Sequence, residues 1–420
     1  MPFRLFRRSL AGLTAASAAF AFGGVAAAAD DYADDQFMDD TAMPTSSTTF
    51  GGASPLDTTR TVQHWAGQTT NPVDGVTYSY NMVGVDPGTN GSASIGVDII
   101  PLDVNVAGRS FSGSDAVAGV LASPLFQDGD YSTTTMVTSS TGGRKLGGAL
   151  SAGNNGVQLL DATMRAEFNK VGTGYHLILV PAVQDAVTID VPADVGTTLS
   201  SPVGITNADI DVHWFSTRVQ NEMKRLQLDP TRLHLFLTKN VVLFADGIPA
   251  HCCIIGAHGA GNATGDSNGS AHGNGSQPVH TFVWSSWLSA GFYNPRKAWA
   301  KQDIHGLSHE IAEWANDPFD NNTVQPWFSP VAPQYGCSNL LETGDPVIGV
   351  GFSQGSNPFF QNVFTDGTYH PEDEALLPWF MRTSPNSTSQ PRQSDPTAGR
   401  YTFMGDLNPF AFFQHPPATC

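Results

Sequence analysis

The stretch DIHGLSHEIAEWANDP, residues 303–318, combines apolar residues at helical spacing with histidines and glutamates. At 100° per residue, four of its apolar side chains fall within about 80° of one another and form one stripe. These are Ile304, Leu307, Ile311 and Trp314. The opposite face carries His305, His309 and Glu313, also within about 80°. The pattern predicts a helix over 303–316 that anchors one face in a core and presents imidazole and carboxylate groups on the other.

His309 and Glu313 are four residues apart, a spacing at which two side chains of one helix bind the same metal ion. Glu310 lies about 100° round the helix, where it reaches a metal-bound water without coordinating the metal. The pattern H-E-x-x-E resembles the H-E-x-x-H motif of zinc proteases with its last histidine replaced. Because glutamate is scarce, only ~0.003 matches are expected by chance. We therefore predict a zinc site with Glu310 as general base, and a solvated helix face is the alternative.

A catalytic zinc takes three protein ligands and leaves a fourth position for water. The next glutamate after the helix is Glu342, in CSNLLETGDP, and it is the predicted third ligand. Asp345 is the alternative third ligand, or a carboxylate that orients His309. His305 is the alternative to Glu313 as second ligand. Two carboxylate ligands would cancel the zinc charge and weaken its acidification of bound water, so catalysis is less certain than metal binding.

Two further histidines and a serine motif are also candidates for function. His258, in CCIIGAH, is a candidate hydrogen-bond donor to a developing oxyanion, and a core histidine is the alternative. His370 precedes three acids at 372–374, which suit a helix N-terminus. Ser353 lies in GFSQG, which fits the G-x-S-x-G motif of serine hydrolases. Glycine and serine are so abundant here that about 0.4 such matches are expected by chance, which disfavours that motif.

Apolar periodicity also predicts the elements around the motif. Helices are expected at 156–171 and 211–226, and strands at 233–245, 252–258 and 279–287. This order of helix, strands and motif helix resembles the lobe above the metal in zincin proteases, in which the last strand before the helix, here 279–287, carries the substrate. Short β-rich runs fill the chain from about residue 61 to about 200. The predicted class is α+β, with a β-rich N-terminal part and a zincin-like C-terminal part that has a mixed sheet and an active-site helix.

Four segments are predicted along the chain. Three arginines, an apolar alanine-rich run and AAAAD are typical of a secretory signal, which predicts export to the periplasm or the medium. The following stretch is acidic and Ser/Thr-rich, as in disordered leaders. No later run approaches about 18 apolar residues, so no membrane span is expected. The segments are a signal peptide (1–29), a leader (30–55), a β-rich region (56–205) and a zincin-like metallohydrolase domain (206–420).

The net charge limits the kinds of binding partner that are expected, and the cysteine content bears on disulfide formation. The chain has 38 acidic and 20 basic residues, a net charge of −18, which excludes nucleic acid as an expected partner. Four cysteines in an exported protein favour disulfides. A bridge between neighbouring cysteines is strained, so Cys252 and Cys253 are each expected to pair with Cys337 or Cys420, in either of two connectivities.

Six segments together resemble a group of secreted bacterial proteins without an assigned activity. They are TVQHWAG (61–67), SPLFQD (123–128), HCCIIGAHGA (251–260), DIHGLSHEIAEWANDPF (303–319), CSNLLETGDP (337–346) and TYHPEDEALLPWF (368–380). The adjacent cysteines followed by G-x-H, and the helix S-H-E-x-x-E-W-x-x-D-P-F, are the most specific parts. The resemblance implies that the helix and the E-T-G-D-P loop belong to one module, and it supplies no substrate.

These features predict a secreted zinc-dependent hydrolase, a metallopeptidase that cleaves peptide or related amide bonds in a peptide or protein substrate. The alternative, from another class, is a non-catalytic secreted surface or binding protein whose metal site is structural or vestigial. The oligomeric state stays open at this stage.

Overall fold

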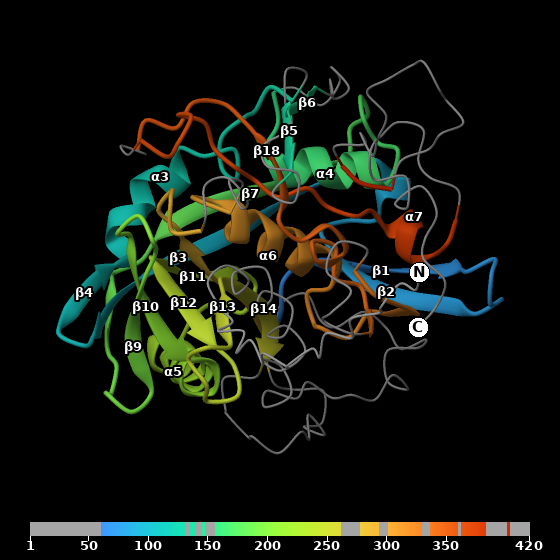
Figure 1. The fold of residues 1–420 in the computed structure, drawn as a ribbon. Helices are drawn as coiled ribbons and strands as arrows, with labels where there is room; N and C mark the ends of the chain where they lie inside the picture. Colours follow the sequence, from blue (N-terminus) through green and yellow to red (C-terminus); the bar gives the residue numbers. More distant parts are fainter. Residues whose placement is uncertain are drawn as a thin grey trace, which may run out of the picture.

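A mixed seven-stranded sheet organises the structure, a computed structural model that describes residues 60–131, 135–138, 145–147, 156–261, 278–293, 301–329, 337–359, 363–383 and 401–403 (Figure 1). Its strands are β14 (Gly256–Gly261), β15 (His280–Trp287), β11 (Leu233–Lys239), β3 (Ser92–Val106) and β4 (Arg109–Ser112), with β7 (His176–Val183) and β8 (Val187–Asp190) also on β3. The pairs among β15, β11, β3, β7 and β8 are parallel, whereas β14 and β4 are antiparallel to their neighbours.

Four smaller sheets surround it. The largest has the order β13 (Cys252–Ile254), β12 (Val241–Phe244), β10 (Thr206–Asp211) and β9 (Gly196–Ser200). The others are β1 (His64–Thr70) with β2 (Thr77–Val83), β16 (Thr323–Trp327) with β17 (Ser338–Leu340), and β18 (Val350–Ser353) with β5 (Thr135–Thr138) and β6 (Lys145–Gly147). The fold is therefore mixed α+β and rich in sheet, as the sequence predicts at this coarser level.

Helices are few in the described part of the chain. They are α3 (Val117–Leu121), α4 (Leu159–Glu167), α5 (Val212–Leu226), α6 (His305–Asn316) and α7 (Leu377–Phe380), with 3-10 turns η1 (Pro87–Thr89), η2 (Gly113–Ala116) and η5 (Asp345–Val347). The predicted helices at 211–226 and 303–316 match α5 and α6, and the one at 156–171 is confirmed in its central part. None of these helices has the length and apolar character needed to cross a bilayer.

Side-chain alternation along the sheet separates two cores. Leu235 and Leu237 of β11 face a core that they share with α4 and α6, whereas Phe236 faces the core that holds α5 and the four-stranded sheet. In the second core the rings of Phe215 and Trp284 meet edge to face, with centroids 5.0 Å apart. Because both faces of β11 are covered, three apolar side chains follow one another along it at Leu235, Phe236 and Leu237. Helix α6 is thereby fixed against one face of the sheet (Figure 1).

The predicted strand at 233–245 is two strands. It divides at Asn240, whose φ of 54° is left-handed, a conformation that asparagine tolerates better than most residues. The first half joins the seven-stranded sheet and the second joins the four-stranded one. The second half, β12, pairs with β13, the strand that holds Cys252 and Cys253. The turn at Asn240 therefore links the seven-stranded sheet to the sheet that contains the two cysteines.

The expected disulfide pairing is wrong. Cys252 and Cys253 bond to each other. Both are buried in β13, whereas Cys337 is exposed and is also disulfide-bonded. The prediction considered only the strain of a bridge between neighbours, and not that both cysteines are buried together in one short strand. Cys420 and the predicted signal peptide and leader (1–29 and 30–55) lie outside the described residues.

The predicted strand at 279–287 is present, and it lies inside the sheet. The segment 279–287 forms β15, which lies inside the sheet between β14 and β11. The strand β14, which follows the cysteine pair, is outermost at this end of the described sheet, and it runs antiparallel to β15. Helix α6 packs against both β15 and β14, and β14 is the one with an unpaired edge among the described strands.

Candidate metal centre

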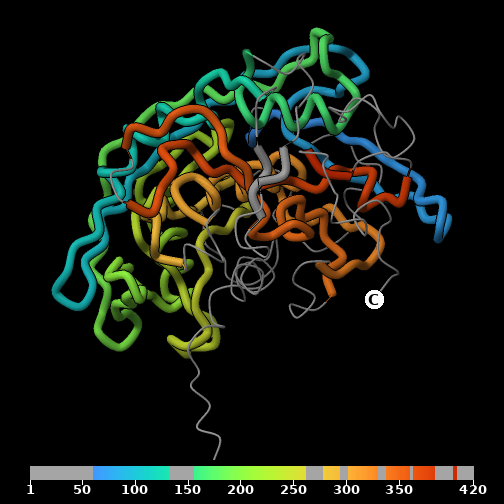
Figure 2. Tube along the Cα trace, turned by 45° about the horizontal axis from the view of Figure 1, so that its top comes forward, coloured from blue at the N-terminus to red at the C-terminus, as the bar shows by residue number. Residues whose placement is uncertain are grey.

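The polar face of α6 is buried. His305, His309 and Glu313 are 1%, 4% and 0% exposed, so the alternative of a solvated helix face is wrong. The apolar face packs in the core against the sheet, as predicted. The polar face is covered by two later segments, one at Gly344 and one at Glu372, which belong to the orange and red chain that returns toward the helix in Figure 2. Histidines and carboxylates on this face must therefore find their partners within the protein.

The edge strand β14 faces α6 with Gly256 and His258. A Cβ atom at Gly256 would collide with the carboxylate of Glu310, so glycine is needed for this close approach. Two residues on, the imidazole of His258 places Nδ1 3.4 Å from Oε2 of Glu310 and 3.6 Å from Oε2 of Glu313. Its other nitrogen, Nε2, lies 3.6 Å from Oε2 of Glu342. The predicted oxyanion donor thus has carboxylates beside both ring nitrogens.

Glu313 has two differently placed oxygens. Its Oε1 accepts hydrogen bonds from the backbone N–H groups of Gly344 and Asp345, at 2.9 and 3.3 Å. Its Oε2 is buried and makes no hydrogen bond to any described residue. That oxygen lies 3.0 Å from Nε2 of His309. The backbone amides therefore hold the carboxylate so that one oxygen is presented to two imidazoles.

The ring of His309 is held by a carboxylate that the sequence did not single out. Its Nδ1 lies 3.1 Å from Oε2 of Glu372, which leaves Nε2 directed toward Glu313. The same Glu372 oxygen lies 2.9 Å from Nε2 of His305. Burial alone would raise the pKa of Glu372, but the charges and hydrogen bonds of His305 and His309 outweigh it and lower the pKa to about 2. His305 is thus directed to Glu372 rather than to the side of His309 that faces Glu313.

The carboxylate of Glu372 is itself fixed from two sides. Gly349 donates its backbone N–H to Oε1 at 2.8 Å, and the backbone N–H of Glu372 donates to Oγ of Ser308 at 2.8 Å. Ser308 precedes His309 in α6, so this hydrogen bond ties the two segments together at the site. Such a carboxylate–histidine pair is the arrangement that orients metal-binding histidines and fixes their tautomer.

The two predicted alternatives for the third ligand occupy different places. Oδ1 of Asp345 lies 3.6 Å from Nε2 of His309, whereas Glu342 faces His258. Between them, Gly344 passes so close to the ring of His309 that a Cβ atom there would collide with it. The E-T-G-D-P loop therefore supplies one carboxylate to each histidine. Glu372 carries out the orienting role that the sequence offered to Asp345.

Three groups of side chains bring potential metal-binding atoms within 4.8 Å of one another in the described chain. They are His309, Glu310 and Glu313; His258, Glu313 and Glu342; and Asp317, Asp320 and Glu342. In the third group Asp317 already accepts hydrogen bonds from the backbone N–H groups of Asn321 and Asn322, as expected of a residue that ends the helix. The first two groups share Glu313 and together contain five of the predicted site residues.

The acids at 372–374 do not begin a helix. Helix α7 starts at Leu377 and has no side-chain cap. His370 is buried instead, with Nδ1 2.7 Å from Oδ2 of Asp303. Burial raises the pKa of Glu374 well above its usual range. The sequence interpretation was wrong because the acids were treated as surface groups, and the packing of this segment against α6 makes them part of the site.

The rival serine motif lacks its structural context. Ser353 is the last residue of β18, and its Oγ donates a hydrogen bond to Asp366 at 3.3 Å. In a nucleophile elbow the serine lies at a sharp turn from a strand into a helix. No helix follows Ser353 in the described residues through 359.

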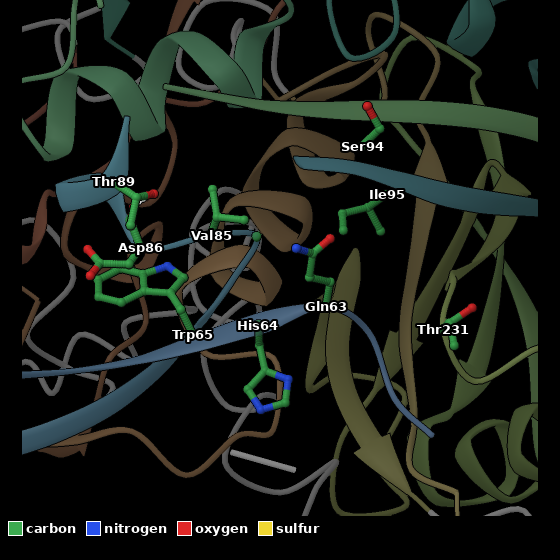
Figure 3. A pocket seen from close by; sticks show the side chains of 10 residues that line it. Gln63, His64, Trp65, Val85, Asp86, Thr89, Ser94, Ile95 and Thr231 are labelled. Atoms are coloured by element: carbon green, nitrogen blue, oxygen red, sulfur yellow. Dashed lines mark hydrogen bonds between the residues drawn. The ribbon is translucent and has the colours of Figure 1, made fainter. Parts of the chain in front are cut away.

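A surface pocket of about 570 Å³ lies elsewhere, beside the hairpin of β1 and β2 (Figure 3). None of the predicted site residues lines it. Three of its side chains have partners: the carboxylate of Asp86 accepts the N–H of Gly88, Nδ1 of His64 lies 2.9 Å from the carbonyl of Val62, and Trp65 packs edge-on against Tyr80 and Phe168. The pocket therefore offers no group of convergent reactive side chains.

Comparisons of the chain with protein-family models, with curated proteins and with solved structures give no match. The distances, burial and charges of its own side chains are therefore what indicate the chemistry of the centre. Glu372 and Ser308 are the functional candidates that sequence reasoning missed. One signal was present, since glutamate is scarce in this chain and two of its seven glutamates fall in PEDE at 371–374.

Proposed function

We propose that the chain is a secreted zinc-dependent hydrolase, most simply a metallopeptidase that cleaves peptide or related amide bonds. The observation that carries the proposal is the position of Oε2 of Glu313, 3.0 Å from Nε2 of His309 and without a hydrogen bond to any described residue. A buried carboxylate oxygen turned toward the outward nitrogen of an oriented histidine is what a bound cation stabilises, because burying an unpaired charge is costly.

The donor set fits zinc. Nε2 of His309 lies 3.0 Å from Glu313 and 3.6 Å from Asp345, and ligand atoms at the corners of a tetrahedral zinc site are separated by about 3.4 Å. One imidazole and two carboxylates are ligands that zinc accepts. These distances favour Asp345 over Glu342 as the third ligand beside His309. Zinc bound there would polarise a substrate carbonyl and acidify a water molecule.

The remaining chemistry belongs to Glu310. Its carboxylate lies within 4.8 Å of the ligand atoms of His309 and Glu313, and its position is fixed by the close approach of Gly256. A carboxylate held at this distance takes the proton of an attacking water and later delivers it to the leaving amine. Glu372 and Ser308 keep the ring of His309 in place during these steps.

The sheet suggests how a substrate would bind. In zincin proteases a strand beside the active helix carries the substrate, and β14 takes that place here. The edge of β14 away from β15 pairs with no described strand. An extended peptide could add to that edge through backbone hydrogen bonds, which would bring its amide bonds past Glu310.

One observation favours a second candidate, a structural metal site in a non-catalytic secreted protein. Every residue of the centre is at most 5% exposed. Structural zinc sites are closed, whereas catalytic ones keep a position open to water and substrate. Both candidate functions include a bound metal ion, but only the hydrolase would turn over a substrate.

The deciding experiment combines metal content with turnover. Zinc per chain is measured by elemental mass spectrometry in the correctly oxidised protein, after mild chelation and return of zinc, for the wild type and for His309→Ala, Glu310→Gln and Asp209→Asn. Quenched fluorescent peptide libraries report hydrolysis. We expect His309→Ala to lose zinc, and Glu310→Gln to keep it while losing at least about 100-fold in rate. Asp209, a buried carboxylate in β10, is the matched control.

Two outcomes would go against this function. No zinc in the folded wild type would remove the metal site altogether. Zinc that depends on His309, with no peptide hydrolysis by the wild type or with equal hydrolysis by Glu310→Gln, would leave the structural role in place of the hydrolase.

A further inference from the structure

Glu313 belongs to two of the three metal-binding groups, and this shared membership points to a second ion. We propose that the centre binds two divalent cations, the second held by His258 and Glu342, with the carboxylate of Glu313 bridging the pair. The inference deepens the proposed function and rests on it for the first ion, at His309.

The second group has ligand spacing similar to the first. Nε2 of His258 lies 3.6 Å from Oε2 of Glu342, close to the separation of about 3.4 Å between ligands of a tetrahedral ion. One ligand atom from each of His258, Glu313 and Glu342 lies within 4.8 Å of the other two. All three side chains are at most 2% exposed. They come from β14, α6 and the loop after β17, so their convergence is a product of the fold and not of one local segment.

The bridging role follows from the contacts of Glu313. The backbone amides of Gly344 and Asp345 occupy Oε1 and fix the plane of the carboxylate. Oε2 then lies 3.0 Å from Nε2 of His309 and 3.6 Å from Nδ1 of His258, without a hydrogen bond to either. Glu342 approaches Nε2 of His258 and Glu313 approaches Nδ1, so the second ion takes one of these nitrogens, which lies within 4.8 Å of a carboxylate oxygen of each glutamate. In this arrangement Oε2 of Glu313 would contact a cation on each side.

The charges of the centre are compatible with a second ion. Glu310, Glu313, Glu342 and Asp345 are four buried carboxylates, and the ion pairs that they make with other described residues join histidines. One dication balances two carboxylates and a second balances the other two.

The ligand types select the class of cation. Calcium and magnesium bind oxygen ligands, whereas an imidazole in each half of the centre suits zinc and similar transition metals. Two ions about 3.5–4 Å apart are the arrangement found in two-metal hydrolases, in which the second ion helps to orient the substrate. His258 is in this arrangement a metal ligand on β14 rather than a donor to an oxyanion.

The test counts ions and measures their coupling. Zinc per chain is determined by elemental mass spectrometry in zinc-saturated, gel-filtered protein for the wild type, Glu342→Gln, His309→Ala and the control Asp209→Asn. Folding of each variant is checked by circular dichroism. Electron paramagnetic resonance of the manganese-loaded wild type reports whether two ions share a bridging ligand, and it does so without relying on any variant.

We expect two zinc ions in the wild type and in Asp209→Asn, at most one in folded Glu342→Gln, and a spin-coupled manganese pair. One zinc in both the wild type and Glu342→Gln, lost in His309→Ala, would overturn the second ion and leave the proposed function standing. An uncoupled manganese spectrum would overturn the bridge. No zinc in the wild type would end both proposals.

Discussion

Nδ1 of His309 lies 3.1 Å from Oε2 of Glu372, although the two residues are 63 positions apart. This pair joins the motif helix to a segment whose acids had suggested only a helix cap. It turns His309 so that Nε2 faces Glu313 and Asp345. The orientation of the candidate metal ligand therefore depends on a residue outside the motif.

Glu372→Gln tests this relationship. The substitution removes the charge that orients His309 while nearly preserving shape, so we expect zinc affinity to fall by about 10- to 100-fold. Competition with a chromogenic chelator measures the dissociation constant, and Asp209→Asn serves as the control. Unchanged affinity in a folded Glu372→Gln protein would show that Glu372 has no part in positioning His309.

Two glycines of the same strand give a matched pair. A Cβ atom at Gly256 would collide with Glu310, whereas one at Gly261 would meet nothing within 4 Å. Gly256→Ala is therefore expected to lower the free energy of unfolding by about 1–3 kcal/mol through overpacking. Gly261→Ala should leave it unchanged or raise it by up to about 1 kcal/mol. Urea denaturation compares them, and equal effects would contradict the close approach.

Asp303 is expected to hold the segment that carries Glu372. It lies 2.7 Å from Nδ1 of His370, and both side chains are fully buried. Burial alone would lower the pKa of His370, but Asp303 and Asp366 outweigh it and raise the pKa to about 9. A raised pKa means that the ion pair stabilises the fold at pH 6 and that this contribution is lost as the pH rises through 9.

Asp303→Asn should accordingly cost about 3 kcal/mol of stability at pH 6 and much less above pH 9. The control is Asp366→Asn, because Asp366 is 30% exposed and lies farther away, 3.4 Å from Nε2 of His370. We expect it to cost less than about 1 kcal/mol. Denaturation curves at pH 6 and 9.5 would contradict the assignment if the two variants were equally destabilised at the lower pH.

Asp209 predicts a second pH effect, remote from the metal centre. Burial in β10 raises the pKa of its carboxyl to about 7. Its stabilising contribution is therefore present below pH 4 and is lost as the pH rises through 7, by at most about 4 kcal/mol. Asp209→Asn imitates the protonated form, so it should narrow the stability difference between pH 5 and pH 8. An identical difference in wild type and variant would show that Asp209 does not titrate in this range.

The helix α6 and its two faces could be predicted from the sequence because helical periodicity is local. The apolar stripe of Ile304, Leu307, Ile311 and Trp314 enters the core as expected, and His309 and Glu313 come together through their four-residue spacing. Helix α5 could be predicted for the same reason. Strand alternation likewise indicated the sheet-rich character of the fold.

Contacts between distant segments could not be predicted in this way. His258 is brought to Glu310 by the register of β14 on β15, and Glu372 is brought to His309 by the return of the chain over α6. The bond between Cys252 and Cys253 was excluded by a local argument about strain that ignored where each cysteine is buried.

The helix, its amphipathic faces and the spacing of His309, Glu310 and Glu313 follow from the local sequence, because they depend on backbone geometry over a few residues. The tertiary structure alone decided that the polar face is buried, that Glu342 and Asp345 approach different histidines, and that Glu372 orients His309. The physical reason is that these contacts join residues far apart in the chain, so they depend on strand register and on the packing of whole segments.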